Sequence, residues 1–178
     1  MTSKPHDIID DITHLRRNRR YLVYVFLLSV WPLLLAYGSQ ILAHLHPCHL
    51  CLLQRYPYMA IILLSAASVG VAKKHRNVAL SVLFICAIIF MIDAGIAIYH
   101  VGVEQHWISG PVSCTSSPMG DLSLEQLRAQ IMAAPVVACD SPVILLFGIS
   151  MAAANFAYAL FCVGASFYMM RKIWRLHR

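Results

Sequence analysis

The chain has 178 residues, of which 60% are hydrophobic and only 12% are charged, and its mean hydropathy is +0.68. Few soluble globular proteins have this composition, and the length is that of a single domain. The net charge of +6 is gathered in a few short segments between apolar stretches, which argues against nucleic acid as a partner.

Four long apolar stretches predict four membrane-spanning helices, because roughly 20 helical residues cross a bilayer core about 30 Å thick. The predicted spans are residues 21–43, 52–72, 78–99 and 143–170. The first is too long for a cleavable signal peptide, and no small-residue cleavage pattern follows it. The expected fold class is therefore an all-α membrane protein. Residues 21–170 form its four-helix bundle, between polar tails at 1–20 and 171–178.

Basic residues predict how these spans are oriented. Twelve of the 14 lysines and arginines lie in the two tails or in the turn between spans two and three. With four spans these segments share one side of the membrane, which the positive-inside rule makes cytoplasmic. Both termini are then cytoplasmic, and the loops 44–51 and 100–142 lie outside.

The first span contains Pro32, which predicts a kink. A helix bundle tolerates such a kink when a neighbouring group satisfies the freed carbonyl. Residues 1–20, which precede the span, are polar and mixed in charge. We expect them to form a frayed or surface-bound tail.

The loop before span two holds a Cys-x-x-Cys pair, Cys48 and Cys51, and Arg55 follows four residues after the second cysteine. Such a pair can cycle between dithiol and disulfide, and its reactive form is the thiolate. We expect the thiolate on Cys51, because it lies near a helix N-terminus and shares a helix face with Arg55. Pro57 falls in the first turns of the span that follows, where a missing N–H costs least.

Three histidines in the same loop, His44, His46 and His49, raise zinc as an alternative use of the cysteines. These ligands are crowded, and the chain offers no second well-spaced pair. Solvated loop histidines are the better interpretation, and we expect no metal.

Span three carries Asp93 at membrane depth, where an acid is costly. Two roles remain open for it: a part in proton or quinone chemistry, or a hydrogen bond to a neighbouring helix. Cys86 and Cys162 lie within spans three and four, and we expect them to be small apolar fillers.

The loop 100–142 is the one sizeable segment outside the predicted spans. Residues 121–134 predict a short amphipathic helix, with Ser123 and Gln126 as a capping box. The loop also holds Cys114 and Cys139. Two cysteine pairs outside the membrane allow either a relay of disulfide exchange or two permanent bridges that staple an outer cap.

Taken together, these features resemble the bacterial disulfide bond formation protein B (DsbB) family. The resemblance rests on four spans, on Cys48-His-Leu-Cys51 at the start of span two with Arg55 after it, and on the Cys114/Cys139 loop. The stretch Tyr99-His-Val-Gly-Val-Glu-Gln, followed by Trp107, Pro111 and Cys114, also looks like this family. The whole resemblance covers about residues 21–170.

The resemblance implies a bacterial inner-membrane enzyme whose cysteine loops are periplasmic. In such a protein Cys114 and Cys139 reoxidise a periplasmic thioredoxin-fold dithiol oxidase, which is DsbA-like. Electrons then pass to Cys48 and Cys51, with a transient bridge from Cys139 to Cys48. Cys51 faces a quinone, either ubiquinone or menaquinone from the membrane pool, and Arg55 holds it.

The resemblance also implies that His100, just after span three, contacts the quinone, although a plain interface histidine is the alternative. Gln54 stands where some members carry an acid. A vitamin K epoxide reductase-like protein fits less well, because its quinone-facing Cys-x-x-Cys follows the loop pair instead of preceding it. A specialised DsbI-like paralogue that serves one partner has the same redox chemistry and stays open.

Overall fold

The computed structural model describes residues 5–44, 46–71, 76–111, 139 and 148–175. The regular elements in these ranges are the helices α1 (Pro5–Ala43), α2 (His49–Leu53), α3 (Arg55–Val71), α4 (Arg76–Glu104) and α6 (Met151–Arg175). Four stretches of helix are long and apolar enough to cross a membrane: Asn18–Leu42, His49–Gly70, Arg76–Glu104 and Met151–Arg175. The predicted all-α fold with four spans is confirmed. The predicted amphipathic helix at 121–134 lies outside the described residues.

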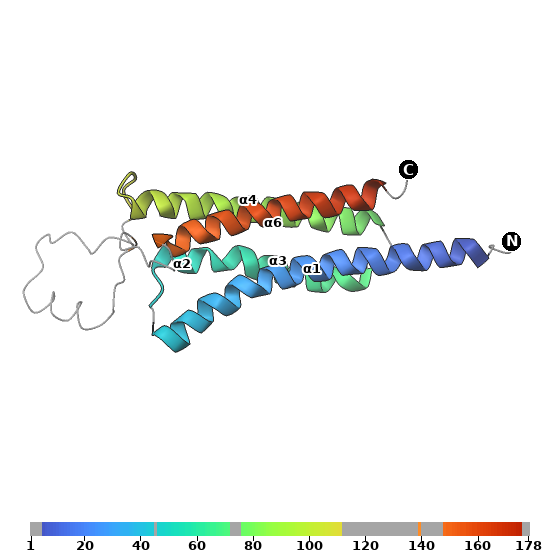
Figure 1. Cartoon of the computed structure of the whole chain (residues 1–178), viewed down its shortest axis with the longest axis horizontal. Coiled ribbons are helices and arrows are strands. Elements are labelled where there is room, and N and C mark those ends of the chain that lie inside the picture. The colour runs from blue at the N-terminus through green and yellow to red at the C-terminus, as the bar shows by residue number, and fades with distance from the viewer. Residues whose placement is uncertain (1–4, 45, 72–75, 112–138, 140–147, 176–178) are drawn as a thin grey trace, which may run out of the picture.

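The helices pack as two pairs, α4 along α6 and α1 along α3. Figure 1 shows that both ends of the chain lie at one end of the bundle, whereas α2 lies at the other. The main buried cluster joins α1, α3, α4 and α6 through residues such as Leu22, Ile61 and Phe90. Cys86 and Cys162 are free thiols fully buried within it, in keeping with the expected role as fillers.

Helix α1 begins at Pro5 and runs unbroken for 39 residues. Residues 5–20 therefore continue the first span as helix, where we had expected a frayed or surface-bound tail. The segment from His6 to Arg20 contains neither glycine nor proline. Extending an existing helix through such residues costs little compared with starting a new one.

The proline inside α1 has the expected consequence. Pro32 has no N–H to bond the carbonyl of Leu28, four residues earlier. The hydroxyl of Tyr158 in α6 donates to that carbonyl instead, at 2.7 Å. In Figure 1 the second half of α1 diverges from the other helices.

A second proline divides the second span. Pro57 lacks the N–H that would bond the carbonyl of Leu53, and its ring crowds that carbonyl. The helix is accordingly broken at Gln54, between α2 and α3. The span begins at His49, before the predicted start at residue 52.

Helix α4 extends five residues past its predicted end and closes with a Schellman motif. His106 takes a left-handed conformation, with φ of 57°. The N–H groups of His106 and Trp107 donate to the carbonyls of Val103 and Gly102, at 3.0 and 2.9 Å. His100 and Glu104 therefore lie within regular helix, on one face.

The bond between Tyr158 and Leu28 can be tested by mutation. Tyr158→Phe leaves the freed carbonyl without its donor, so we expect the free energy of unfolding to fall by about 1 kcal/mol. Unfolding of the purified protein in detergent, followed by circular dichroism, measures the change. Tyr168→Phe is the control, because Tyr168 lies exposed on the same helix.

Pro32→Ala sharpens this test, because alanine at 32 restores the N–H that bonds Leu28. In that background Tyr158→Phe is expected to cost less. An equal cost in both backgrounds contradicts the pairing.

Candidate active site

The Cys-x-x-Cys pair lies where the second span starts. Cys48 is the N-cap of α2, in an extended conformation, and its sulfur accepts the N–H of Cys51 at 3.2 Å. The two sulfurs lie 2.8 Å apart, within reach of a hydrogen bond, and both residues are free thiols. The two sulfurs are thus held close enough to join as a disulfide.

A histidine from α4 completes this group. His100 is buried, and its Nε2 lies 3.6 Å from the Cys48 sulfur. Its Nδ1 lies 3.2 Å from the amide nitrogen of Gln54, which follows α2. One carboxylate oxygen of Glu104, a turn further along α4, lies 3.8 Å from Nε2. The imidazole is therefore fixed on both of its nitrogens.

These contacts change the acidity of Cys48. The side chain of Cys51 is the largest influence and, with His100 and the backbone N–H of Cys51, it lowers the pKa of Cys48 well below 9.0 despite burial. We had expected the stabilised thiolate at Cys51. The interactions that stabilise a thiolate are instead at Cys48, one turn earlier. A stabilised thiolate favours the dithiol over the disulfide and makes the pair more oxidising.

Arg55, at the start of α3, points toward α1. Its Nη1 donates to the side-chain oxygen of Gln40 at 3.1 Å, and its guanidinium lies 4.8 Å from the centre of the Tyr37 ring. Its Nε is buried, and no hydrogen-bond partner for it exists among the described residues. A buried N–H of this kind is costly unless a ligand accepts it.

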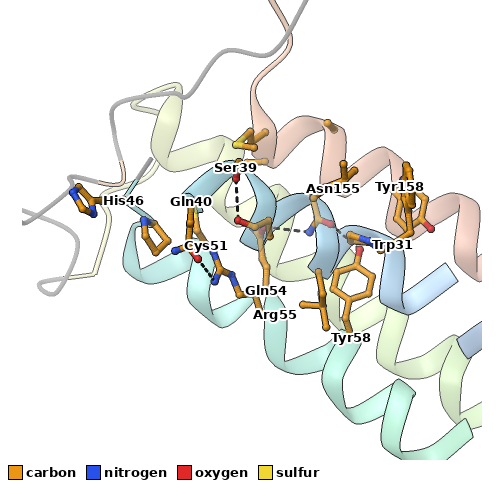
Figure 2. Close-up of a pocket in the computed structure, with 18 residues that line it drawn as sticks. Trp31, Ser39, Gln40, His46, Cys51, Gln54, Arg55, Tyr58, Asn155 and Tyr158 are labelled. Atoms are coloured by element: carbon orange, nitrogen blue, oxygen red, sulfur yellow. Dashed lines mark hydrogen bonds between the residues drawn. The ribbon is translucent and has the colours of Figure 1, made fainter. Parts of the chain in front are cut away.

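A cavity of about 290 Å³ lies between α1, the second span and α6. Figure 2 shows Cys51 and Arg55 at its wall, with Trp31 and Tyr158 further along. Most of its lining is apolar, with a few polar side chains, as in sites for small molecules. His100 is not among the lining residues, whereas Cys51 and Gln54 are.

Comparison with protein families matches residues 18–169 to the family described as disulfide bond formation protein DsbB. The chain belongs to the DsbB family. A relative from Rickettsia prowazekii (strain Madrid E), described as uncharacterized protein RP370, is 26% identical over 149 residues, which cover 81% of this chain and 84% of the relative. No solved structure matches the chain.

Membership of the DsbB family makes this chain a membrane oxidoreductase of disulfide bond formation. The structure brings Cys48, Cys51 and Arg55 to one end of the bundle, as the resemblance implied. Cys139 is disulfide-bonded and buried, and it belongs to the same buried cluster as Cys48. The cysteine bonded to Cys139 lies outside the described residues, because the other described cysteines are free. Cys114 also lies outside them.

The described residues hold one group with ligand-like spacing, formed by Cys48, Cys51 and His100, whose ligand atoms lie within 4.8 Å of one another. Structural zinc takes four protein ligands, whereas catalytic zinc takes three and a water, so three ligands are too few for a structural site. The loop histidines that had raised the possibility, His44, His46 and His49, do not belong to the group.

Two polar residues of this site were not predicted from the sequence. Gln54 was left uninterpreted, and Asn155 passed as part of an apolar span. Asn155 donates to the side-chain oxygen of Gln54 at 3.2 Å and to Asp93 at 3.1 Å, and it accepts from Tyr58 at 2.7 Å. An asparagine within a membrane span was the available signal, because a polar group there needs a partner.

The lowered pKa of Cys48 can be measured by thiolate absorbance. We expect the difference spectrum between the dithiol and disulfide forms to show a thiolate at a lower pH in the folded protein than in the unfolded chain. In Cys51→Ala the largest stabilising contact is lost, so the midpoint should rise. Coincident titrations of folded and unfolded protein contradict this assignment.

Proposed function

We propose that the protein reoxidises a periplasmic DsbA-like dithiol protein and passes the electrons through two cysteine pairs to a quinone. The observation that carries the proposal is the cavity, whose largely apolar wall includes both Cys51 of the redox pair and Arg55. Membership of the DsbB family supports it independently.

The cavity suits a quinone headgroup in size and in chemistry. Its volume of about 290 Å³ is at the small end of the range for ligand sites. Its apolar walls accept a ring, and the guanidinium of Arg55, a lining residue, offers a hydrogen bond that a ring carbonyl accepts. Bound there, a quinone supplies a two-electron, two-proton acceptor, so that the Cys48/Cys51 dithiol becomes a disulfide and the quinone a quinol.

The chain's own residues divide the work at this step. Cys51 lines the cavity and presents its sulfur to the acceptor. Cys48 is held as a thiolate beside it. When a bound quinone takes up two electrons, the two sulfurs would join as a disulfide, and the Cys51 proton and one from solvent would complete the quinol. Arg55 stabilises negative charge that develops on the ligand, since its guanidinium stays ionised in an apolar setting. Gln40 and Tyr37 hold Arg55 in place.

Cys139 joins this pair to the outer loop. We assign its disulfide partner as Cys114, following the family resemblance. The partner protein's thiolate attacks Cys114 and releases Cys139, which then attacks Cys48 of the Cys48–Cys51 disulfide and frees Cys51. The partner's second thiol displaces Cys114 and leaves the partner oxidised. Cys114 then attacks Cys139, which restores the Cys114–Cys139 bridge and releases Cys48, so that Cys48 and Cys51 become the dithiol. Placement of Cys139 and Cys48 in one buried cluster supports this direction of attack.

The same proposal orients the protein in a bacterial inner membrane. Both ends of the chain lie at the end of the bundle opposite α2, the helix that carries Cys51 and is capped by Cys48 (Figure 1). Basic residues concentrate near those ends, which supports a cytoplasmic location for them and a periplasmic one for the cysteines. The oxidised partner then lies in a compartment where disulfides persist.

The relay predicts different defects for the two pairs. With a reduced DsbA-like protein as donor, Cys51→Ser should abolish quinone reduction. Cys114→Ser should block oxidation of the donor, yet leave quinone binding intact. Quinone absorbance and donor thiol content, measured in detergent with ubiquinone and with menaquinone, report both steps. Cys86→Ala is the matched control, and full turnover by Cys51→Ser would rule out the relay.

Arg55 should act chiefly on the quinone. Arg55→Met removes a charge-assisted hydrogen bond, so we expect KM for quinone to rise about 10- to 100-fold. The lowered pKa of Cys48 should be kept. Steady-state kinetics and the thiolate titration measure the two effects. An unchanged KM places the quinone outside this cavity.

A further inference from the structure

A chain of polar contacts runs from Cys48 into the apolar interior of the bundle. From the Cys48 sulfur it passes to His100, then to Gln54, then to Asn155, and it ends at Asp93. These groups come from α4, α6 and the break between α2 and α3. The mechanism above uses only the first two of them, so the remainder calls for a physical explanation.

At the inner end of this series of polar contacts, each group is fixed as a hydrogen-bond donor or acceptor. Asp93 is fully buried in α4, and its Oδ2 receives the amide nitrogen of Asn155 at 3.1 Å. This oxygen is an acceptor in a carboxylate, and also in a carboxylic acid whose proton is on Oδ1. On its other side, Asn155 Oδ1 accepts the Tyr58 hydroxyl at 2.7 Å. The Asn155 amide therefore has one orientation.

That orientation passes to the next residue. The second hydrogen of the Asn155 amide nitrogen is donated to Gln54 Oε1, at 3.2 Å. Gln54 must then turn its own amide nitrogen toward His100 Nδ1, which lies 3.2 Å away. An amide nitrogen can only donate, so Nδ1 is an acceptor, and a neutral imidazole carries its proton on Nε2.

We propose that Asp93 is a positioning residue for the redox pair: acting through Asn155 and Gln54, it selects the Nε2–H tautomer of His100 and so aims a hydrogen-bond donor at the Cys48 sulfur. The donor stabilises the thiolate form of Cys48. The role belongs to the same site as the proposed oxidase activity, and it rests on Cys48 acting there as a thiolate.

The other groups around His100 agree with this tautomer. Its own helix contributes Glu104, whose oxygen lies 3.8 Å from Nε2 and also favours a proton there. Cys48 and Cys51 face it from the start of α2, and α6 contributes the neutral Asn155 through Gln54. The cation Arg55 at the start of α3 is directed toward Gln40 and Tyr37 of α1.

The decisive variant is Gln54→Glu. It keeps the size of the side chain but replaces the donor with a second acceptor. His100 Nδ1 must then carry a proton. Nitrogen NMR of ring-labelled histidine, at a pH where imidazoles are neutral, reads this directly, and His100→Gln assigns the signal. We expect an unprotonated Nδ1 in the wild type and a protonated one in Gln54→Glu.

Asp93→Asn tests the last group in this series of polar contacts. An amide at 93 can turn either its oxygen or its nitrogen toward Asn155, so both tautomers of His100 should appear. The thiolate midpoint of Cys48 should rise, by up to about one to two pH units where the donor is lost, because a hydrogen bond to a charged group contributes about that much. Ser166→Ala is the control, since Ser166 is buried on α6 and bonds only within its own helix.

These measurements need neither quinone nor partner protein, so they separate this inference from the oxidase proposal. Loss of quinone turnover alone leaves it untouched. A wild-type His100 with its proton on Nδ1 overturns the inference, and so does a tautomer unchanged in Gln54→Glu. A sole Nε2–H tautomer in folded Asp93→Asn removes Asp93 from the role. A purely structural Asp93 lowers stability without moving the tautomer or the thiolate midpoint.

Discussion

Asn155 is the side chain on which the polar interior of this bundle depends. It bonds Tyr58 of α3, Asp93 of α4 and Gln54 at the break in the second span. No water is available in the hydrocarbon region, so each of these groups must find its partner within the protein. One amide on α6 therefore links three separate segments, and it does so directly beneath the thiols.

Two prolines shape the backbone around this network. Pro57 breaks the second span at Gln54, which frees that side chain to reach both His100 and Asn155. Pro32 leaves the carbonyl of Leu28 in α1 without its helical partner, and Tyr158 donates to it instead. Pro57 allows the series of polar contacts to form, and Pro32 accompanies the divergence of α1 that opens the cavity. Both effects follow from the lack of a single N–H group.

Much of this could be predicted from the sequence, because hydropathy and cysteine spacing are local signals. The four spans, the filler cysteines and the neighbour that satisfies the Pro32 kink are present as expected. The thiolate was expected on Cys51, because the helix start was taken to lie nearby; Cys48 is the N-cap, and it receives the N–H. Gln54 and Asn155 are 101 residues apart in the chain, so only tertiary packing reveals that they meet.

The divergence of α1 has a consequence for how the cavity is reached. Its wall includes Trp31 and Leu35, which are also exposed on the outside of the first span. The outside of a membrane span faces lipid. Any occupant of the cavity can therefore enter sideways from the bilayer, without crossing water. Occupancy then depends on the mole fraction of the ligand among the lipids, and diluting the protein in buffer leaves it unchanged.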